Sequence, residues 1–189
     1  MIVNIAGTNG SGKTYVVRAL LEQSKLVQKV PGNDVWKEFG RLVELAPGRT
    51  IFVLGRYDSF DTGGADTIKD PELIYKLIFE HAAKGEDVVY EGSYAMNHMR
   101  GIDMVNKMKK ANIPVCVLLL QTTLEECKAS INERRHRRGD PPFTNSWKWV
   151  EQSITRARNF ADKLRWNGAT VYKIERQQAP SKLIELLKQ

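Results

Sequence analysis

Gly7-Thr8-Asn9-Gly10-Ser11-Gly12-Lys13-Thr14 is the stretch that decides the fold of this chain of 189 residues. It matches the pattern G-x-x-x-x-G-K-[ST] in full. Glycines let successive backbone N–H groups turn towards one anion, and a helix that begins here adds its positive end. Lys13 would reach the β- and γ-phosphates of a nucleoside triphosphate, and the Thr14 hydroxyl would ligate Mg²⁺. We therefore expect the residues from Gly7 to Thr14 to bind ATP.

The segments on either side of this loop predict a strand and a helix. Ile2–Ala6 is an apolar run that ends where the loop begins, and apolar residues recur at helical spacing from Lys13 to about Ser24. Strands and helices then alternate, and Pro114–Leu120 is a continuous apolar run typical of the middle of a parallel sheet. This order predicts an α/β protein of the P-loop nucleoside triphosphate hydrolase fold, with a mainly parallel sheet flanked by helices.

We expect residues 1–189 to form a single domain, because no linker, repeat or low-complexity tract interrupts the chain. A β-rich stretch of about 25–48 departs from the alternating order. Its strands, Lys25–Val30 and Arg41–Leu45, are expected to form a small excursion, whereas Thr50–Leu54 is typical of a core strand. Asp70-Pro71 predicts the start of a helix, with the Asp as its N-cap.

The composition excludes several classes of protein. Hydrophobic residues make up 42% of the chain and charged residues 27%, which is ordinary for a globular protein and excludes a disordered chain. No apolar run approaches the roughly 20 residues that span a bilayer, so we expect no membrane partner. The first residues lack the basic stretch and cleavage site of a secretory signal. Since Cys116 and Cys127 form no C-x-x-C pair, we expect reduced thiols and a cytoplasmic location.

The net charge of +7 is concentrated in one part of the chain. Residues 128–165 hold ten Lys or Arg against four Asp or Glu, an excess of +6. Such a segment can bind the phosphates of a nucleotide or of a nucleic acid, and it can equally be a solvated helix face.

Two other classes of P-loop protein fit the sequence less well than a kinase. Asp61-Thr62-Gly63-Gly64 resembles the D-x-x-G switch of GTPases, but Lys109 stands where their base-recognition motif, begun here by Asn106-Lys107, needs an Asp. A motor ATPase or helicase usually needs a longer chain and an acidic pair after a hydrophobic strand. We therefore interpret the loop as part of a small phosphotransferase.

An arginine-rich segment predicts the lid of such an enzyme. Glu133-Arg134-Arg135-His136-Arg137-Arg138 ends the helix that follows the apolar strand Val115–Leu120. A lid closes over ATP so that guanidinium groups meet the charge on the transferring phosphoryl group. Arg134 and Arg138 lie four residues apart, on one helix face, so we expect both to act in catalysis within a lid of about 134–145. The alternative is a basic surface segment.

Carboxylates at the ends of two strands are candidates for proton transfer and for metal binding. Asp58 follows Ile51–Leu54 at the carboxyl edge of the sheet, where ligands bind, and is our candidate for the base. Asp61 and Asp66 lie in the same loop and are alternatives. Glu91 ends the strand Val88–Tyr90, where we expect it to hold Mg²⁺ or its water shell, unless it caps the next helix.

Together these residues resemble a family of bacteriophage P-loop kinases, in which G-R-Y-D is commonly followed by G-G-x-D-T-I. The matching stretches are Gly55-Arg56-Tyr57-Asp58, Gly63-Gly64-Ala65-Asp66-Thr67-Ile68 and Tyr90-Glu91-Gly92, with Trp149 beyond the lid. The family includes 5-hydroxymethyluracil DNA kinases, which phosphorylate the hydroxymethyl group of a modified base in DNA, and proteins labelled nucleoside or nucleotide kinases. The resemblance implies an ATP- and Mg²⁺-dependent phosphotransferase in the host cell cytoplasm. Polynucleotide kinases share the core and place an Asp after the second core strand, which supports Asp58.

The basic segment favours DNA carrying a hydroxymethylated base as the acceptor. An enzyme that acts on a base in DNA needs aromatic platforms for the unstacked base and cations along the backbone. The residues that we expect to bind the substrate are Arg56, Asp66, Trp149, Arg156 and Arg158. The alternatives are a nucleoside or nucleotide monophosphate kinase and, in another class, a non-catalytic nucleic-acid-binding ATPase. The oligomeric state and the choice between ATP and GTP stay open.

Overall fold

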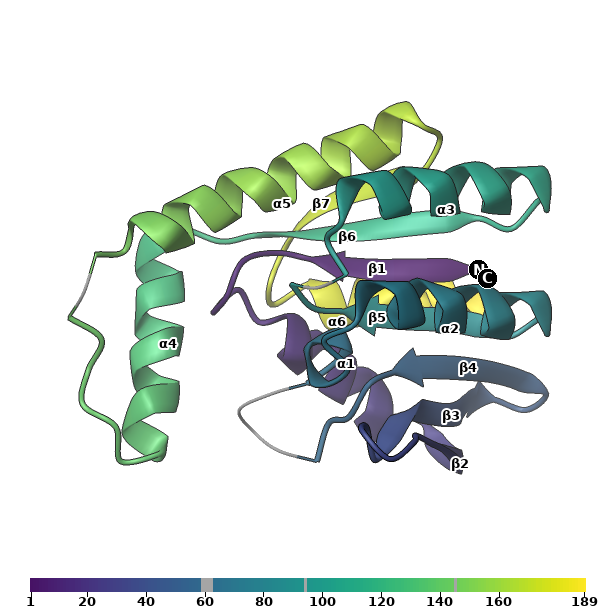
Figure 1. Ribbon diagram of the computed structural model, residues 1–189, viewed down its shortest axis with the longest axis horizontal. Coiled ribbons are helices and arrows are strands. Elements are labelled where there is room, and N and C mark those ends of the chain that lie inside the picture. The colour runs from purple at the N-terminus through teal and green to yellow at the C-terminus, as the bar shows by residue number, and fades with distance from the viewer. Residues whose placement is uncertain (59–62, 94, 145) are drawn as a thin grey trace.

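A seven-stranded sheet forms the centre of the computed structural model, which describes residues 1–58, 63–93, 95–144 and 146–189 (Figure 1). The strand order is β2-β3-β4-β5-β1-β6-β7. Strands β4, β5, β1, β6 and β7 run parallel, as the alternating sequence predicts, whereas β2 and β3 extend one edge with antiparallel pairing. The strands are β1 (Ile2–Ala6), β2 (Lys25–Pro31), β3 (Glu38–Ala46), β4 (Arg49–Leu54), β5 (Asp87–Glu91), β6 (Val115–Gln121) and β7 (Thr170–Glu175).

Helices cover both faces of the sheet, because the central strands are apolar on both sides (Figure 1). On one face lie α1 (Lys13–Glu22) and α6 (Ala179–Lys188), which bury Val17, Leu20 and Leu183. On the other face lie α2 (Pro71–Ala83), α3 (His98–Lys110) and α5 (Lys148–Trp166). The remaining long helix, α4 (Leu124–Arg137), stands apart from the two layers beyond the carboxyl ends of the strands. The predicted α/β fold is confirmed.

Polar caps set the starts of the helices that frame the site. The Asp70 side chain accepts hydrogen bonds from the backbone N–H groups of Glu72 and Leu73, so the predicted start of α2 is confirmed. The alternative role of Glu91 as the cap of the next helix is wrong, because Asn97 caps α3 by accepting from the Arg100 N–H. Thr123 starts α4 with a reciprocal capping box.

The β-rich excursion continues the main sheet beyond β4. Val43 of β3 pairs with Ile51 of β4, and β2 forms the outermost strand. The pairing of β2 with β3 shifts register between Leu26 and Gln28 and again before Pro31. Of the helices in the described part of the chain, none combines the length and the apolar character that crossing a bilayer requires.

Candidate active site

The phosphate loop lies between β1 and α1 at the carboxyl edge of the sheet. Gly10 and Gly12 adopt φ values of 81° and 96°, which favour glycine. A Cβ on Gly10 would lie 2.6 Å from the Cys127 carbonyl oxygen of α4, so the loop needs glycine there for packing as well. The Ser11 hydroxyl and the Lys13 ammonium group donate to the Thr8 carbonyl oxygen at 2.8 and 2.9 Å. The loop therefore has the compact, glycine-dependent form that phosphate binding requires.

Thr14 and Glu91, both expected to bind metal, are brought together by the fold. The Thr14 hydroxyl donates to Glu91 Oε1 at 2.9 Å, and the Glu91 side chain, at the end of β5, is 2% exposed. Burial raises the pKa of the Glu91 carboxyl to about 7, although the Lys13 charge and the Thr14 hydrogen bond act in the opposite direction. Hydroxyl and carboxylate oxygens are ligands that suit Mg²⁺.

The Thr14 hydroxyl and the Glu91 carboxylate fit a metal ion whose other ligands are waters and substrate phosphates. Within the described ranges, no three His, Cys, Asp or Glu side chains form a group that could hold a metal ion. Mg²⁺ bound to nucleotides typically keeps several waters and takes substrate phosphates as ligands, so one hydroxyl and one carboxylate are a sufficient protein contribution.

The glycine pair at positions 63 and 64 packs directly against the proposed metal ligands. A Cβ on Gly63 would lie 2.9 Å from Thr14 Cγ2, and one on Gly64 would lie 2.9 Å from the Glu91 carboxyl carbon. Asp66 follows in the same motif, and its Oδ1 would lie 2.9 Å from a Cβ on Gly92, next to Glu91. The negative charge of Asp66 also contributes to the raised pKa of Glu91. The G-G-x-D motif thus shapes the surroundings of Glu91, a role of Asp66 that sequence reasoning missed and that stands beside its predicted contact with the substrate.

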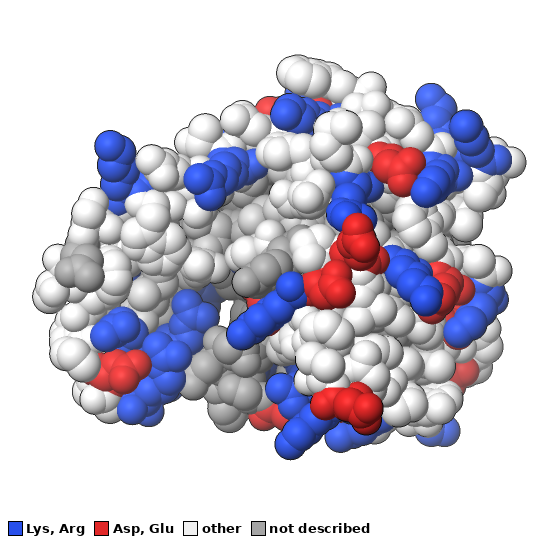
Figure 2. All heavy atoms as spheres, viewed as in Figure 1, with Lys and Arg blue, Asp and Glu red and all other residues white. Residues whose placement is uncertain are grey.

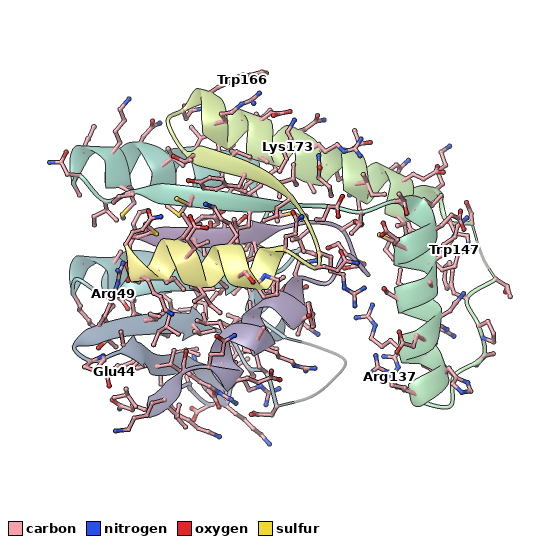
Figure 3. All side chains as sticks on the ribbon, turned by 180° about the vertical axis from the view of Figure 1, so that it is seen from behind. Glu44, Arg49, Arg137, Trp147, Trp166 and Lys173 are labelled. Carbon is pink, nitrogen blue, oxygen red and sulfur yellow. The ribbon has the colours of Figure 1, made fainter. Side chains whose placement is uncertain are left out.

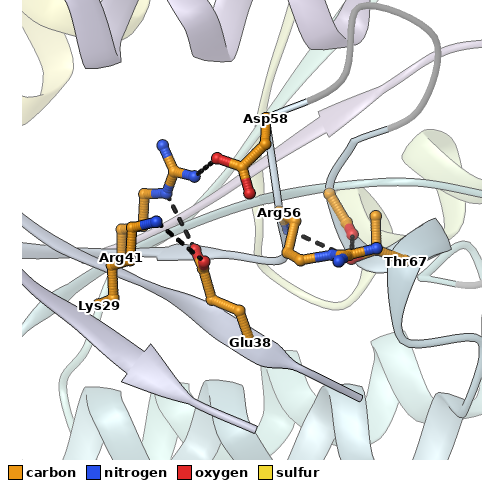
Figure 4. A network of polar contacts seen from close by, with 7 residues as sticks. Lys29, Glu38, Arg41, Arg56, Asp58 and Thr67 are labelled. Carbon is orange, nitrogen blue, oxygen red and sulfur yellow. Dashed lines mark hydrogen bonds and ion pairs between the residues drawn. The ribbon is translucent and has the colours of Figure 1, made fainter. Parts of the chain in front are cut away.

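Asp58 lies at the same edge, just beyond β4, and its side chain is 56% exposed (Figure 4). Its carboxylate forms an ion pair with the Arg41 guanidinium group, and Arg41 Nε also donates to Glu38 Oε1 at 2.9 Å. The neighbouring Arg56 is held through its backbone N–H, which donates to the Thr67 hydroxyl at 3.2 Å. The alternative base, Asp61, lies outside the described residues.

The arginine-rich segment occupies the end of α4 and borders a hollow between this helix and the body of the protein (Figure 2). Cys127 and Ile131 pack against Val150 of α5, and Arg134 continues the same helix face. Arg138 Nε lies 3.1 Å from Asp140 Oδ2. Arg135 Nε donates to the Pro141 carbonyl oxygen at 2.6 Å. The Arg135 guanidinium group is therefore bound to the loop that follows α4.

Arg156 and Arg158, the two arginines of α5 that we expect to bind the substrate, do not share a helix face. Arg158 lines a small cavity of about 40 Å³ together with Thr8 of the phosphate loop and Lys173 of β7, which is labelled in Figure 3. Arg156, two residues earlier, lies on a different side of the helix, because residues at this spacing do not share a face. Trp149 is partly exposed at the start of α5, with its ring 6.1 Å from that of Phe143.

Arg176, which follows β7, is a residue of this site that sequence reasoning missed. Its Nε would lie 2.8 Å from a Cβ on Gly12, and its guanidinium carbon lies 5.5 Å from the centre of the Tyr15 ring. Its Nη1 also donates to the Ser130 hydroxyl of α4 at 3.0 Å. Arg176 thus connects the phosphate loop with the lid helix. No motif could indicate this contact, because its partners lie far apart in the chain.

The raised pKa of Glu91 predicts a pH-dependent affinity for Mg²⁺. Below its pKa of about 7 the carboxyl is protonated and loses its attraction for a cation, so affinity should fall as the pH falls. Between about pH 8 and pH 6 the carboxylate fraction drops about tenfold. We expect the Mg²⁺ concentration for half-maximal activity at saturating ATP to rise by about the same factor. Glu91→Gln should need more Mg²⁺ at every pH, without this dependence; an unchanged requirement in the unmodified protein would contradict the assignment.

Comparisons with known proteins show the family of the chain. A family model described as an AAA domain matches residues 2–157, which is most of the chain. The chain belongs to this family. It is 30% identical over 195 residues to the 5-hmdU DNA kinase of Pseudomonas phage PaMx11, covering 98% of this chain and 96% of that protein. It is 24% identical over 181 residues to 5-hmdU DNA kinase 1 of Salmonella phage ViI, covering 88% and 77%.

A solved structure, the tunicamycin resistance protein of Deinococcus radiodurans, is similar with a TM-score of 0.53. Its sequence identity is 16%, and the match covers 98% of this chain and 94% of that one, so this similarity concerns the fold alone. The family and the phage relatives identify the chain as a P-loop kinase, and the predicted enzyme class and family resemblance are confirmed. ATP is the nucleotide that this family implies.

Proposed function

We propose that this kinase transfers the γ-phosphate of ATP to the hydroxymethyl group of 5-hydroxymethyluracil in phage DNA. The observation that carries this acceptor is the 30% identity, over nearly the whole chain, with a phage protein named 5-hmdU DNA kinase. The same match gives no support to the alternative of a nucleoside or nucleotide monophosphate kinase. Phage DNA is modified where it is replicated, so we also propose the host cytoplasm as the location.

The proposed reaction uses residues that lie at one edge of the sheet. The hydroxymethyl oxygen attacks the γ-phosphorus, the bond to the bridging β-phosphate oxygen breaks, and ADP leaves. Asp58 takes the proton of the attacking hydroxyl, and Arg41 holds its carboxylate in place. Lys13, Arg134 and Arg138 stabilise the negative charge that spreads over the transferring group.

Thr14 and Glu91 would hold Mg²⁺, directly or through its water shell. The ion, when bound, neutralises charge on the phosphate oxygens. The contact between the Thr14 hydroxyl and the Glu91 carboxylate supports this assignment, because both oxygens already face one point beside the phosphate loop.

Five residues are proposed to bind the substrate. Arg56 lies two residues before Asp58 in the chain, and Asp66 lies beside Glu91, so we propose that these two contact the acceptor nucleotide. Trp149, Arg156 and Arg158 are proposed to contact DNA from α5. Because Arg156 and Arg158 lie on different sides of this helix, they would contact different parts of the strand.

A transfer assay with a panel of acceptors tests this function. The panel contains one DNA sequence with 5-hydroxymethyluracil or with thymine at the same position, together with the corresponding free nucleosides and monophosphates. We expect labelled γ-phosphate to appear on the hydroxymethylated DNA alone. Robust transfer to a mononucleotide with none to the hydroxymethylated DNA would overturn the acceptor, and ATP hydrolysis without transfer to any acceptor would favour a nucleic-acid-binding ATPase.

The lid arginines give a separate test of the proposed transition-state stabilisation. We expect Arg134→Ala and Arg138→Ala each to reduce turnover on the order of tenfold or more, because a cation that meets the transferring phosphoryl group is lost. Lys128→Ala is the control, since it removes one positive charge from α4 nearer the start of the helix, where the ammonium group is paired with Glu125. Steady-state turnover at saturating ATP provides the measurement. Equally small effects at all three positions would favour a solvated helix face.

A further inference from the structure

The turn between β2 and β3 lies beyond the carboxyl edge of the sheet, on the side of Asp58. Strand β3 runs antiparallel to β4, with Gly40 opposite Leu54, so β3 begins at the edge where β4 ends. Pro31, the last residue of β2, pairs with Glu38 at the start of β3. Residues 32–37 therefore extend past the same edge that carries the phosphate loop, Glu91 and Asp58.

This turn is held in one conformation by its own hydrogen bonds. The Asn33 side chain accepts from the backbone N–H groups of Val35 and Trp36 at 3.0 and 2.9 Å. The Asn33 N–H in turn donates to the Trp36 carbonyl at 2.7 Å, and the Trp36 ring packs against the hydrophobic core. Val35, at the tip, is nevertheless 72% exposed. A β-branched apolar side chain on a fixed turn gains no burial from folding.

Ion pairs tie this hairpin to the proposed catalytic carboxylate (Figure 4). Glu38, at the base of the turn, is buried and bonds Arg41, which in turn bonds Asp58. Lys29 of β2 lies 3.8 Å from the same Glu38 carboxylate. Because a buried, paired charge is costly to move, this network fixes the position of the turn relative to Asp58.

The charge of the hairpin end suits a local contact with DNA. Of the charged residues between positions 29 and 38, Lys29 is paired with Glu38, and Lys37 and Asp34 lie on the turn itself. Lys37 can meet one backbone phosphate next to the reacting nucleotide, and the turn carries too little positive charge to follow a long stretch of duplex. The exposed apolar tip between these charges is therefore the distinctive feature of the surface.

We propose that the β2–β3 turn is the element that opens duplex DNA for this kinase, with Val35 entering the base stack beside the target nucleotide. A base cannot be modified inside the stack, and apolar side chains inserted between bases unstack them. The inserted Val35 occupies the space that the target base leaves as it turns towards Asp58, while Lys37 contacts an adjacent phosphate. This inference rests on the proposed function, because it requires a base in duplex DNA as the acceptor.

The test compares transfer to one oligonucleotide containing 5-hydroxymethyluracil in single-stranded form and in duplex form. For Val35→Ala we expect the duplex rate to fall at least about tenfold and the single-strand rate to stay unchanged, because only the duplex must be unstacked. Val35→Leu keeps an apolar tip and should retain the duplex rate. Val27→Ala is the matched control, since Val27 is 56% exposed on the same hairpin but away from the tip.

A duplex with a mismatch at the target base, together with the activity of the unmodified enzyme, shows whether the turn acts by unstacking the base. Placing the target base opposite a mismatch, where it is already unpaired, should restore the Val35→Ala rate. An equal effect of Val35→Ala on both forms, or none on either, would overturn the role of the turn, as would an unmodified enzyme that acts on single strands alone. If the unmodified enzyme transfers phosphate to neither form, the proposed acceptor is wrong and the role of the turn is overturned with it.

Discussion

Replacing Lys13 with alanine is expected to lower the turnover of phosphate transfer by at least about a hundredfold, or roughly 3 kcal/mol of transition-state stabilisation. Lys13 is buried at the start of α1, and its ammonium group lies against the phosphate loop, 2.9 Å from the Thr8 carbonyl oxygen. Single-turnover transfer of labelled γ-phosphate measures the effect.

Two controls accompany this variant. Lys163→Ala removes an exposed lysine of α5 and should leave turnover unchanged. The thermal unfolding temperature of Lys13→Ala establishes that the variant is folded, since Lys13 is a buried residue. Near-normal transfer by a folded Lys13→Ala protein would refute the role of the loop in phosphate binding.

Asp58→Asn is expected to lower turnover on the order of a hundredfold or more while leaving the KM for ATP nearly unchanged. Asparagine keeps the shape of the side chain and an oxygen that can accept from Arg41, but it cannot take up the proton of the attacking hydroxyl. Steady-state kinetics with varied ATP separate the two effects. A fully active Asp58→Asn protein beside an inactive Asp61→Asn or Asp66→Asn protein would move the base to one of those residues.

Asp66→Asn should behave differently from Asp58→Asn. Asp66 lies beside Glu91, whose pKa its charge helps to raise, so its removal should favour the ionised form of Glu91. In this variant we expect the Mg²⁺ concentration for half-maximal activity to start rising at a lower pH than in the unmodified protein. The same titration of activity against Mg²⁺ that tests Glu91 measures this shift.

The parts of the fold that depend on neighbouring residues could be predicted from the sequence. The phosphate loop is recognisable because one short segment supplies all its chemistry, and Asp70-Pro71 starts a helix through local hydrogen bonds. The start of β3 was less well predicted: this strand begins at Glu38, earlier than the expected Arg41. Gly40 has a low preference for strands, and its place in β3 comes from pairing with Leu54 of the next strand.

The contacts that complete the site could not be predicted, because they join residues that are distant in the chain. Arg41 of β3 reaches Asp58, which follows the neighbouring strand β4, and Arg176, which follows β7, reaches Ser130 of α4. The sequence placed Glu91 correctly at a strand end, but its raised pKa follows from burial by the Gly63-Gly64 segment. Such effects require the packed structure, whereas residue type and spacing carry no signal for them.

The irregular pairing of β2 bears on the behaviour of the protein at high concentration. An outer strand offers unpaired backbone groups to a second molecule, and regular, flat edges promote aggregation. The register shift after Leu26 interrupts this edge, Pro31 removes an N–H donor from it, and Lys25 and Lys29 add repelling charges. The edge of the sheet that carries the β2–β3 turn is therefore protected against strand-to-strand self-association.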